Sequence, residues 1–134
     1  MPRCDLPLDT NICIAFLNEK DPILRARLAG TSQDEVRLCT IVKAELFYGA
    51  RNGTRVEQNL ARLARLFELF DCVPFDAAAA HHYGVLRAQL RRSGTAVGAN
   101  DMLIAAIALA ADLTLVTRDQ AEFHHIGGLR VEAW

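Results

Sequence analysis

The stretch Leu8-Asp9-Thr10-Asn11-Ile12 marks the point at which a first strand is expected to give way to a first helix. Residues 3–8 form a short, imperfect strand candidate, and residues 12–17 carry apolar side chains at helical spacing. Thr10 or Asn11 is expected to cap the helix, because their side-chain oxygens accept from free amides at a helix start. Asp9 is then either a helix cap itself or a site carboxylate, since open α/β sheets bind ligands beyond their strand ends.

Strand and helix patterns alternate along the rest of the chain. Further strands are expected at residues 36–40, 72–75, 114–117 and 129–134. Helices are expected at residues 22–29, 41–51, 54–70, 76–92 and 100–111, with a short turn through Phe123. The expected helix caps are Asp21, Thr40, Asp76 and Thr54, the last in a capping box with Glu57. This alternation predicts one domain over residues 1–134, with a parallel sheet covered by helices on both faces.

Composition narrows the class of protein. The 134 residues carry 15 basic and 16 acidic side chains, so the net charge of -1 does not by itself indicate nucleic-acid binding. No apolar run approaches the ~20 residues of a membrane span. The first residues are too few and too polar for a secretory signal, so we expect a cytoplasmic protein without membrane contact.

The thiols and imidazoles form no recognisable metal motif. The four cysteines (Cys4, Cys13, Cys39 and Cys72) are widely spaced and are expected to be free and mostly buried. The histidines occur as two adjacent pairs, whose members point in different directions on a helix or strand. No zinc spacing is present.

Four carboxylates stand out by position. Asp9 and Asp119 each follow a predicted strand. Asp101 lies near the start of the helix expected at residues 100–111, which is strongly apolar, and Glu45 lies about one turn into the helix after the second strand. Strand ends and helix starts share one edge of a right-handed crossover fold, so we expect all four to converge there. Asp101 also suits the first turn of a helix, and Asp119 a turn, so both interpretations stay open.

Clustered carboxylates repel one another, and their natural partner is a cation. Hard oxygen ligands indicate magnesium or manganese. The chemistry that such a site supports is metal-assisted attack of water on a phosphodiester.

At these residues the chain resembles the PIN-domain ribonucleases, and in particular the VapC toxins of bacterial toxin–antitoxin pairs. The resembling stretches occur in order at residues 8–12, 42–49, 97–106, 115–123 and 128–132. The resemblance implies an α/β, PIN-like three-layer fold with a parallel sheet of order 3-2-1-4-5. That order would place the first strand beside the fourth, and so Asp9 beside Asp119.

The resemblance also implies roles for individual residues. The positions that match the acidic metal-binding and catalytic triad of the family are Asp9, Glu45 and Asp101. Asp119 matches a fourth position that is acidic in some members and Asn in others. Asn11 and Thr117 match polar positions expected to hold these carboxylates in place.

By this likeness the protein is a magnesium-dependent endoribonuclease that acts on tRNA, with initiator tRNA as the expected substrate. The expected partner is a VapB-like antitoxin, and operator DNA would be bound only through the antitoxin. A homodimer and a larger toxin–antitoxin assembly are also implied. Exposed arginines on the helices form either basic rims for RNA or ordinary solvated faces: Arg51, Arg55, Arg87, Arg91 and Arg92.

Two other functions stay open at this point. A receiver-like regulatory module also places acids at strand ends, but it needs a lysine on a late strand, and the two lysines of this chain, Lys20 and Lys43, are both early. A catalytically silent PIN-like binding module is the second alternative. The presence of all four acids argues against it.

The first strand contains an anomaly. It should be central in the sheet, yet it contains Asp5 and Pro7. Because proline has no amide to donate to a ladder, we predict a locally broken hydrogen-bond pattern at Pro7, with Asp5 near the exposed start of the strand.

Overall fold

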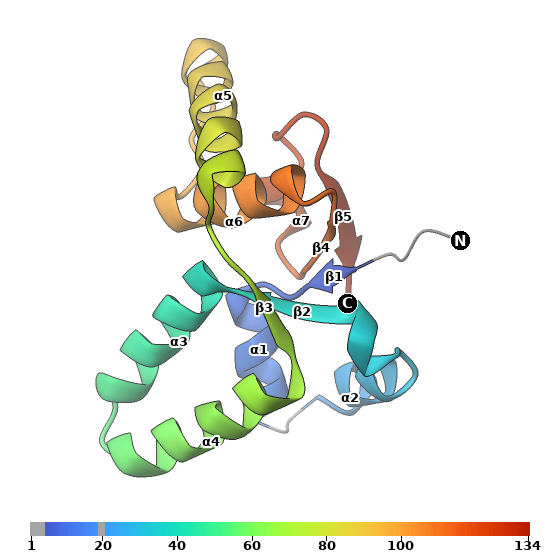
Figure 1. The fold of residues 1–134 in the computed structure, drawn as a ribbon, viewed down its shortest axis with the longest axis vertical. Coiled ribbons are helices and arrows are strands. Elements are labelled where there is room, and N and C mark those ends of the chain that lie inside the picture. Colours follow the sequence, from blue (N-terminus) through green and yellow to red (C-terminus); the bar gives the residue numbers. More distant parts are fainter. Residues whose placement is uncertain (1–4, 19–20) are drawn as a thin grey trace.

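The computed structural model describes residues 5–18 and 21–134, and Figure 1 shows their arrangement. Strands and helices alternate along these residues, as the sequence predicts. The strands are β1 (Leu6–Pro7), β2 (Val36–Cys39), β3 (Asp71–Val73), β4 (Thr114–Thr117) and β5 (Arg130–Ala133). The helices are α1 (Thr10–Leu17), α2 (Pro22–Ala29), α3 (Thr40–Arg51), α4 (Val56–Leu69), α5 (Ala77–Ser93), α6 (Ala99–Ala110) and α7 (Gln120–Phe123), with a 3-10 turn, η1 (Gln33–Glu35).

The strands form two parallel ladders that meet at one bridge. In the first ladder β2 lies between β1 and β3, and in the second β4 pairs with β5. A single parallel bridge between Leu8 and Val116 connects them. This α/β arrangement is consistent with the expected order 3-2-1-4-5, although β1 and β4 share no continuous ladder.

Pro7 explains the break between the two ladders. On the side that faces β4, Thr114 N–H donates to the Asp5 carbonyl at 3.2 Å and Asp9 N–H donates to the Val116 carbonyl at 2.9 Å. The parallel pattern requires an amide donor from residue 7 between these two bonds, and proline has none. The predicted local break is therefore confirmed. The regular strand is also much shorter than the expected residues 3–8, of which residues 3 and 4 lie outside the described part.

Asp5 is less exposed than the sequence predicts. Its side chain is half-buried, with Oδ2 3.7 Å from Arg37 Nη2 on β2, and Arg37 Nη1 also contacts Asp71 Oδ2 at 2.7 Å. Asp5 Oδ1 is buried and has no hydrogen-bond partner among the described residues. The expectation of an exposed strand start is wrong here, because Arg37 draws the carboxylate against the sheet.

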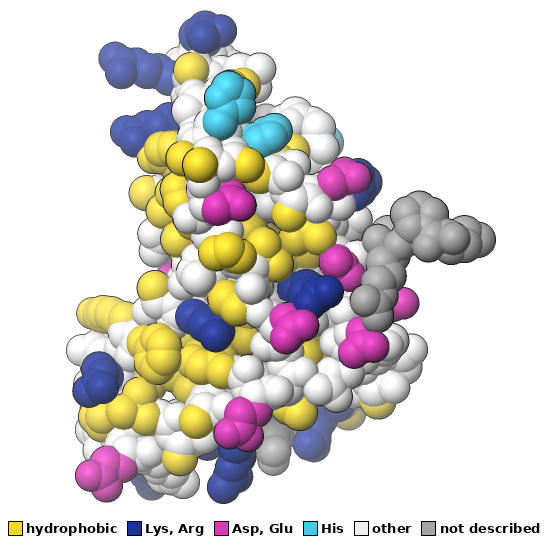
Figure 2. All heavy atoms as spheres, viewed as in Figure 1, with side chains coloured by type: hydrophobic (Ala, Val, Ile, Leu, Met, Phe, Trp, Pro, Cys, Tyr) yellow, Lys and Arg dark blue, Asp and Glu magenta, His cyan; other side chains and the backbone are white. Residues whose placement is uncertain are grey.

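Helices cover the sheet on two sides. In Figure 1, α1 to α4 lie on one side of the strands and α5 to α7 lie on the other. Helices α3 and α4 form a helical hairpin, and Figure 2 shows apolar side chains gathered over it. Helix α6 carries five consecutive buried residues, Ile104 to Ala108, which confirms that its apolar sequence packs in the core.

Two of the predicted helix caps form and two do not. Asp21 Oδ1 accepts from Leu24 N at 3.0 Å, and Asp76 Oδ1 accepts from Ala79 N at 2.9 Å, as expected. Thr40 does not cap α3, because it is the first helical residue and its hydroxyl accepts from the amide of Phe75.

The capping box predicted at Thr54 is also wrong. Helix α4 begins at Val56, after Arg55, and no side chain caps it. The N-cap position is occupied by Arg55, one residue after Thr54, so the Thr54 hydroxyl does not cap the helix. Glu57 therefore lies in the first turn as an exposed acid, where it complements the helix dipole.

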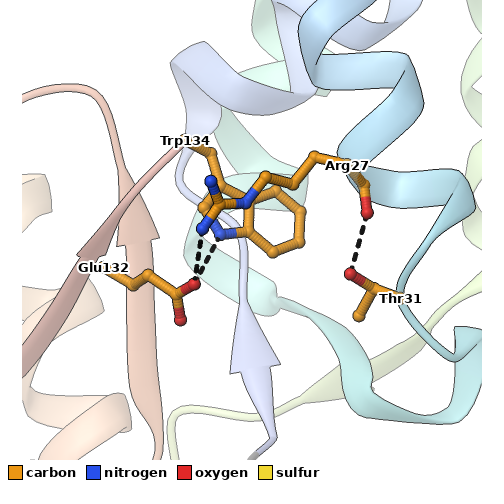
Figure 3. A network of polar contacts seen from close by, with 4 residues as sticks. All are labelled: Arg27, Thr31, Glu132 and Trp134. Carbon is orange, nitrogen blue, oxygen red and sulfur yellow. Dashed lines mark hydrogen bonds and ion pairs between the residues drawn. The ribbon is translucent and has the colours of Figure 1, made fainter.

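Helix α2 and strand β5 are joined by a network of polar contacts, shown in Figure 3. Arg27 Nη2 lies 3.0 Å from Glu132 Oε1, and the indole Nε1 of Trp134 donates to the same oxygen at 3.1 Å. The Arg27 guanidinium lies 5.5 Å from the centroid of the Trp134 ring. Residues about a hundred positions apart in the sequence are thereby held together.

Cys13 and Cys39 are free and buried, as the sequence predicts, whereas Cys72 is only half-buried and Cys4 lies outside the described residues. Burial raises the pKa of the Cys39 thiol to about 11 and raises that of Cys13 further, so neither thiol is reactive at neutral pH. None of the helices described here has the length and apolar character needed to cross a membrane.

Candidate active site

Asp9 caps α1, and its carboxylate is held at the carboxyl end of β1, where a site residue was expected. It is 5% exposed and lies between β1 and α1. Its Oδ1 accepts from Ile12 N at 2.9 Å and so caps α1, while its Oδ2 accepts a short hydrogen bond from the Thr117 hydroxyl. The cap expected from Thr10 or Asn11 is therefore supplied by Asp9. The carboxylate is fixed through both oxygens and through the ladder bond of its own amide to Val116.

Thr117 connects the ends of β1 and β4. Its hydroxyl donates to Asp9 and accepts from the amide of Asp119 at 2.9 Å. Asp119 in turn is the N-cap residue of α7, although its contact to the amide of Glu122 is long at 3.4 Å. One buried hydroxyl thus sets the positions of two of the acids that the sequence singled out.

Glu45 projects from the second turn of α3 and is half-buried. Its Oε1 accepts from the Thr10 hydroxyl at 2.8 Å. The sequence assigns the task of holding a carboxylate to Asn11, but Asn11 is exposed and shows no hydrogen bond to an acid in the part of the chain that is described. Thr10 makes that contact instead, because α1 begins at Thr10 and turns Asn11 outward.

Asp101 lies in the first turn of α6 and is paired with an acid that the sequence analysis did not include, Glu122 of α7. Glu122 Oε1 accepts from the amide of Gly98 at 2.8 Å. A Cβ at Gly98 would lie 3.3 Å from Glu122 Oε1 and 3.5 Å from Asp101 Oδ2, so glycine permits this close approach. The only sequence signal for Glu122 was its spacing, three residues after the N-cap Asp119.

The charges of these acids act on one another. Burial raises the pKa of Asp9, and the charges of Asp119 and Glu45 raise it further, against hydrogen bonds from Thr117 and Ile12 that lower it. Burial, a hydrogen bond and charge from Glu122, and the charges of Glu45 and Asp9 together raise the pKa of Asp101 to about 7. The Gly98 amide and Asp101 lower the pKa of Glu122. The five acids therefore form one electrostatic cluster, termed here the acidic cluster.

The donor set of the acidic cluster is all oxygen, which suits a hard divalent cation. As the side chains lie, no three Asp, Glu, His or Cys groups within residues 5–18 and 21–134 are close enough to chelate an ion. The residues thus fit a divalent cation in the chemistry of their donor atoms, although their present positions do not form a ligand set.

Helix α2 supports the same edge of the sheet. Its N-cap residue Asp21 forms a short ion pair with Arg118, which lies between Thr117 and Asp119. The hydrogen bond from the amide of Leu24, followed by the contact with Arg118, lowers the pKa of Asp21. Arg118 therefore points its charge to α2, and the turn between β4 and α7 is held from outside the acidic cluster.

Comparison with known proteins identifies the family to which this chain belongs. The sequence profile of the PIN domain matches residues 7–129. The tRNA(fMet)-specific endonuclease VapC of Shigella flexneri is 39% identical over 127 residues, which cover 95% of this chain and 96% of the relative. Ribonuclease VapC2 of Rickettsia felis is 35% identical over 128 residues, with the same coverage.

A solved structure shows the same fold. DNA-bound VapBC from Salmonella typhimurium has a TM-score of 0.92 and 35% identity, and the match covers 98% of each chain. The protein belongs to the PIN-domain family and, within it, to the VapC ribonucleases of toxin–antitoxin pairs.

Proposed function

We propose that this protein is a magnesium-dependent endoribonuclease toxin that hydrolyses phosphodiester bonds in tRNA, with initiator tRNA as its substrate. The observation that supports this most directly is the acidic cluster. Burial and the charges of Asp119 and Glu45 raise the pKa of Asp9, and burial and neighbouring acids raise the pKa of Asp101 to about 7. Such a concentration of repelling charge destabilises the fold, and a bound cation relieves it.

In this proposal Asp9 and Asp101 are the main metal ligands. Glu45 and Asp119 complete the ligand set or orient the attacking water. A bound Mg²⁺, or Mn²⁺ with similar oxygen preference, polarises the phosphate and lowers the pKa of bound water. Hydrogen bonds from Thr117 and from the amide of Ile12 hold Asp9 in position, and the Thr10 hydroxyl holds Glu45 through one of its oxygens.

The 39% identity with the Shigella protein, over 95% of this chain, supports the tRNA substrate, because that relative is named as a tRNA(fMet)-specific endonuclease. The surface offers cations for the phosphate backbone: Arg91 and Arg92 are exposed in the last turn of α5, and Figure 2 shows Lys and Arg side chains gathered at that end of the helix. An RNA substrate would place the reaction in the cytoplasm.

The partners of this protein are inferred from a solved structure of a relative. The Salmonella structure is a DNA-bound VapBC complex, which supports a VapB-like antitoxin as partner. We infer that operator DNA is bound only through that antitoxin. We also infer a homodimer within the larger assembly, and a single PIN domain over residues 1–134. Light scattering of the free chain and of the co-expressed pair tests both assemblies.

The test is cleavage of in vitro transcribed initiator tRNA by the purified chain, with elongator tRNA as the comparison. We expect cutting with Mg²⁺ and none with excess EDTA. Asp9→Asn and Asp101→Asn should each lower the rate by about a thousandfold, because metal catalysis contributes several kcal/mol and each 1.36 kcal/mol is tenfold.

Asp112→Asn is the matched control. Asp112 is an exposed acid that precedes β4, at the opposite end of that strand from Thr117 and Asp119. It is paired with Arg130, and its φ of 56° is one that Asn tolerates. This variant should cut at the wild-type rate. Retained cutting by both Asp9→Asn and Asp101→Asn would exclude the proposed site, and equal cutting of elongator tRNA would exclude the proposed specificity.

A further inference from the structure

Tyr48 is a large, exposed aromatic side chain on α3. Its ring is 61% exposed, and it lies three residues after Glu45, so both side chains are on the same side of α3. Within the described residues, no hydrogen bond or ring contact involves Tyr48. Its neighbour Phe47 is different, because it packs edge-on against Phe67 of α4, with 5.2 Å between ring centroids.

A hollow of about 420 Å³ lies beside Tyr48. Its lining consists of Ile41, Ala44, Glu45, Tyr48 and Asn100. Glu45 belongs both to this lining and to the acidic cluster, and Asn100 immediately precedes Asp101. The hollow therefore opens directly onto the site where the phosphodiester would be cut.

The lining selects the chemistry of its occupant. Tyr48 supplies an aromatic face, Ile41 and Ala44 an apolar surface, and the exposed amide of Asn100 can both donate and accept hydrogen bonds. The Glu45 charge disfavours a phosphate in the hollow. A flat ring with a polar edge suits all of these features, and that is the description of a nucleobase.

The geometry points to a base-binding subsite in which an unpaired nucleotide next to the scissile phosphate stacks on Tyr48 and presents its edge to Asn100. This inference rests on the proposed RNA cleavage and adds the side chains that would hold a base beside the cut. Bases in an A-form helix are stacked on their neighbours, whereas loop bases can be splayed onto aromatic side chains. Tyr48 thereby favours loops over stems.

The experiment compares three variants on a synthetic RNA hairpin whose loop carries the bond that the wild type cuts. Tyr48→Ala should raise KM about tenfold with kcat little changed, because base–aromatic stacking contributes about that factor or more. Tyr48→Phe keeps the ring and should keep KM. Phe47→Ala removes an exposed aromatic on the same helix and should leave KM unchanged, although it loses the Phe67 contact.

A second substrate isolates the stacking contact. The same hairpin with an abasic residue next to the cleaved bond should raise the wild-type KM by a similar factor, and should cause no further rise in Tyr48→Ala. Additive effects of the two changes would overturn the subsite. A change in the oligomeric state of Tyr48→Ala would also overturn it, by assigning the ring to a subunit contact.

The two proposals fail in different ways. If the wild type cuts no RNA, the nuclease assignment is wrong whatever Tyr48 does. If the wild type cuts and Tyr48→Ala cuts with the same KM, only the subsite is wrong. Circular dichroism and thermal melts of each variant show that the measured differences come from folded protein.

Discussion

Thr117 donates a hydrogen bond to Asp9 across the line where the two ladders meet, although 108 positions separate them in the sequence. Both side chains are buried, at 0% and 5% exposure. The hydroxyl fixes the carboxylate that we propose as a main metal ligand, and the same oxygen accepts from the amide of Asp119.

Thr117→Val should therefore lower both stability and activity. The substitution keeps the shape but leaves the Asp9 oxygen and the Asp119 amide without this partner, which costs about 1–3 kcal/mol of unfolding free energy. We expect a rate about ten- to a hundredfold lower, by analogy with groups that orient metal ligands. Thr117→Ser keeps the hydroxyl and should stay near wild type in rate. Urea titrations and cleavage assays test both, and equal rates for the two variants would contradict the role.

The two functions of Asp9 can be separated by substitution. Asp9→Asn keeps an oxygen that can cap α1, whereas Asp9→Ala removes the cap and should cost about 1 kcal/mol of stability. Neither variant should cut RNA, because neither has the carboxylate. The comparison of their denaturant midpoints isolates the cap. If both variants are equally stable, the hydrogen bond to Ile12 contributes nothing measurable.

The raised pKa of Asp101 predicts how stability depends on pH. Between its unfolded value near 3.8 and its folded value of about 7, the folded chain binds more protons than the unfolded chain. The free energy of unfolding without metal should therefore fall as pH rises through this window. Asp101→Asn should flatten the dependence, which thermal melts in EDTA across the same range would show.

Divalent cation should reverse that loss. Mg²⁺ should raise the melting temperature above about pH 7, where Asp101 is ionised, and much less near pH 5, where a proton competes for the same oxygens. Asp112→Asn serves again as the control and should respond as the wild type does. A Mg²⁺ effect of equal size at both pH values would show that Asp101 is not a ligand.

Arg27→Ala should loosen α2 from β5. It removes the ion pair to Glu132 and the cation–π contact with Trp134. Both groups are partly exposed, so we expect a loss of only about 1 kcal/mol. Arg27→Lys should recover part of it, because an ammonium keeps the charge but not the planar stacking. Trp134 fluorescence in urea gives both values.

Much of the fold could be predicted because its signals are local. The apolar run of α6, the strand β4 and the caps at Asp21 and Asp76 appear in the structure as the sequence indicates. The Thr54 cap failed because Thr, Glu and their spacing do not determine where the chain turns. Asp9 was assigned two alternative roles, and its separate oxygens allow both.

The part of the site that could not be predicted depends on contacts between distant segments. Glu122 joins the acidic cluster only because α7 lies against the start of α6, where the Gly98 N–H donates to Glu122 Oε1. Thr10 contacts Glu45 because α1 begins at Thr10, two residues before the expected helical segment, with Asp9 as its cap. Neither relationship has a signal within a short window of sequence.

The missing amide of Pro7 also affects how the acidic cluster is held together. One ladder supplies Asp9, the other supplies Thr117 and Asp119, and between the two ladders the regular pattern is reduced to one bridge. The arrangement of Asp9 against Thr117 and Asp119 therefore depends on the docking of the two ladders, and neither ladder alone contains the acidic cluster.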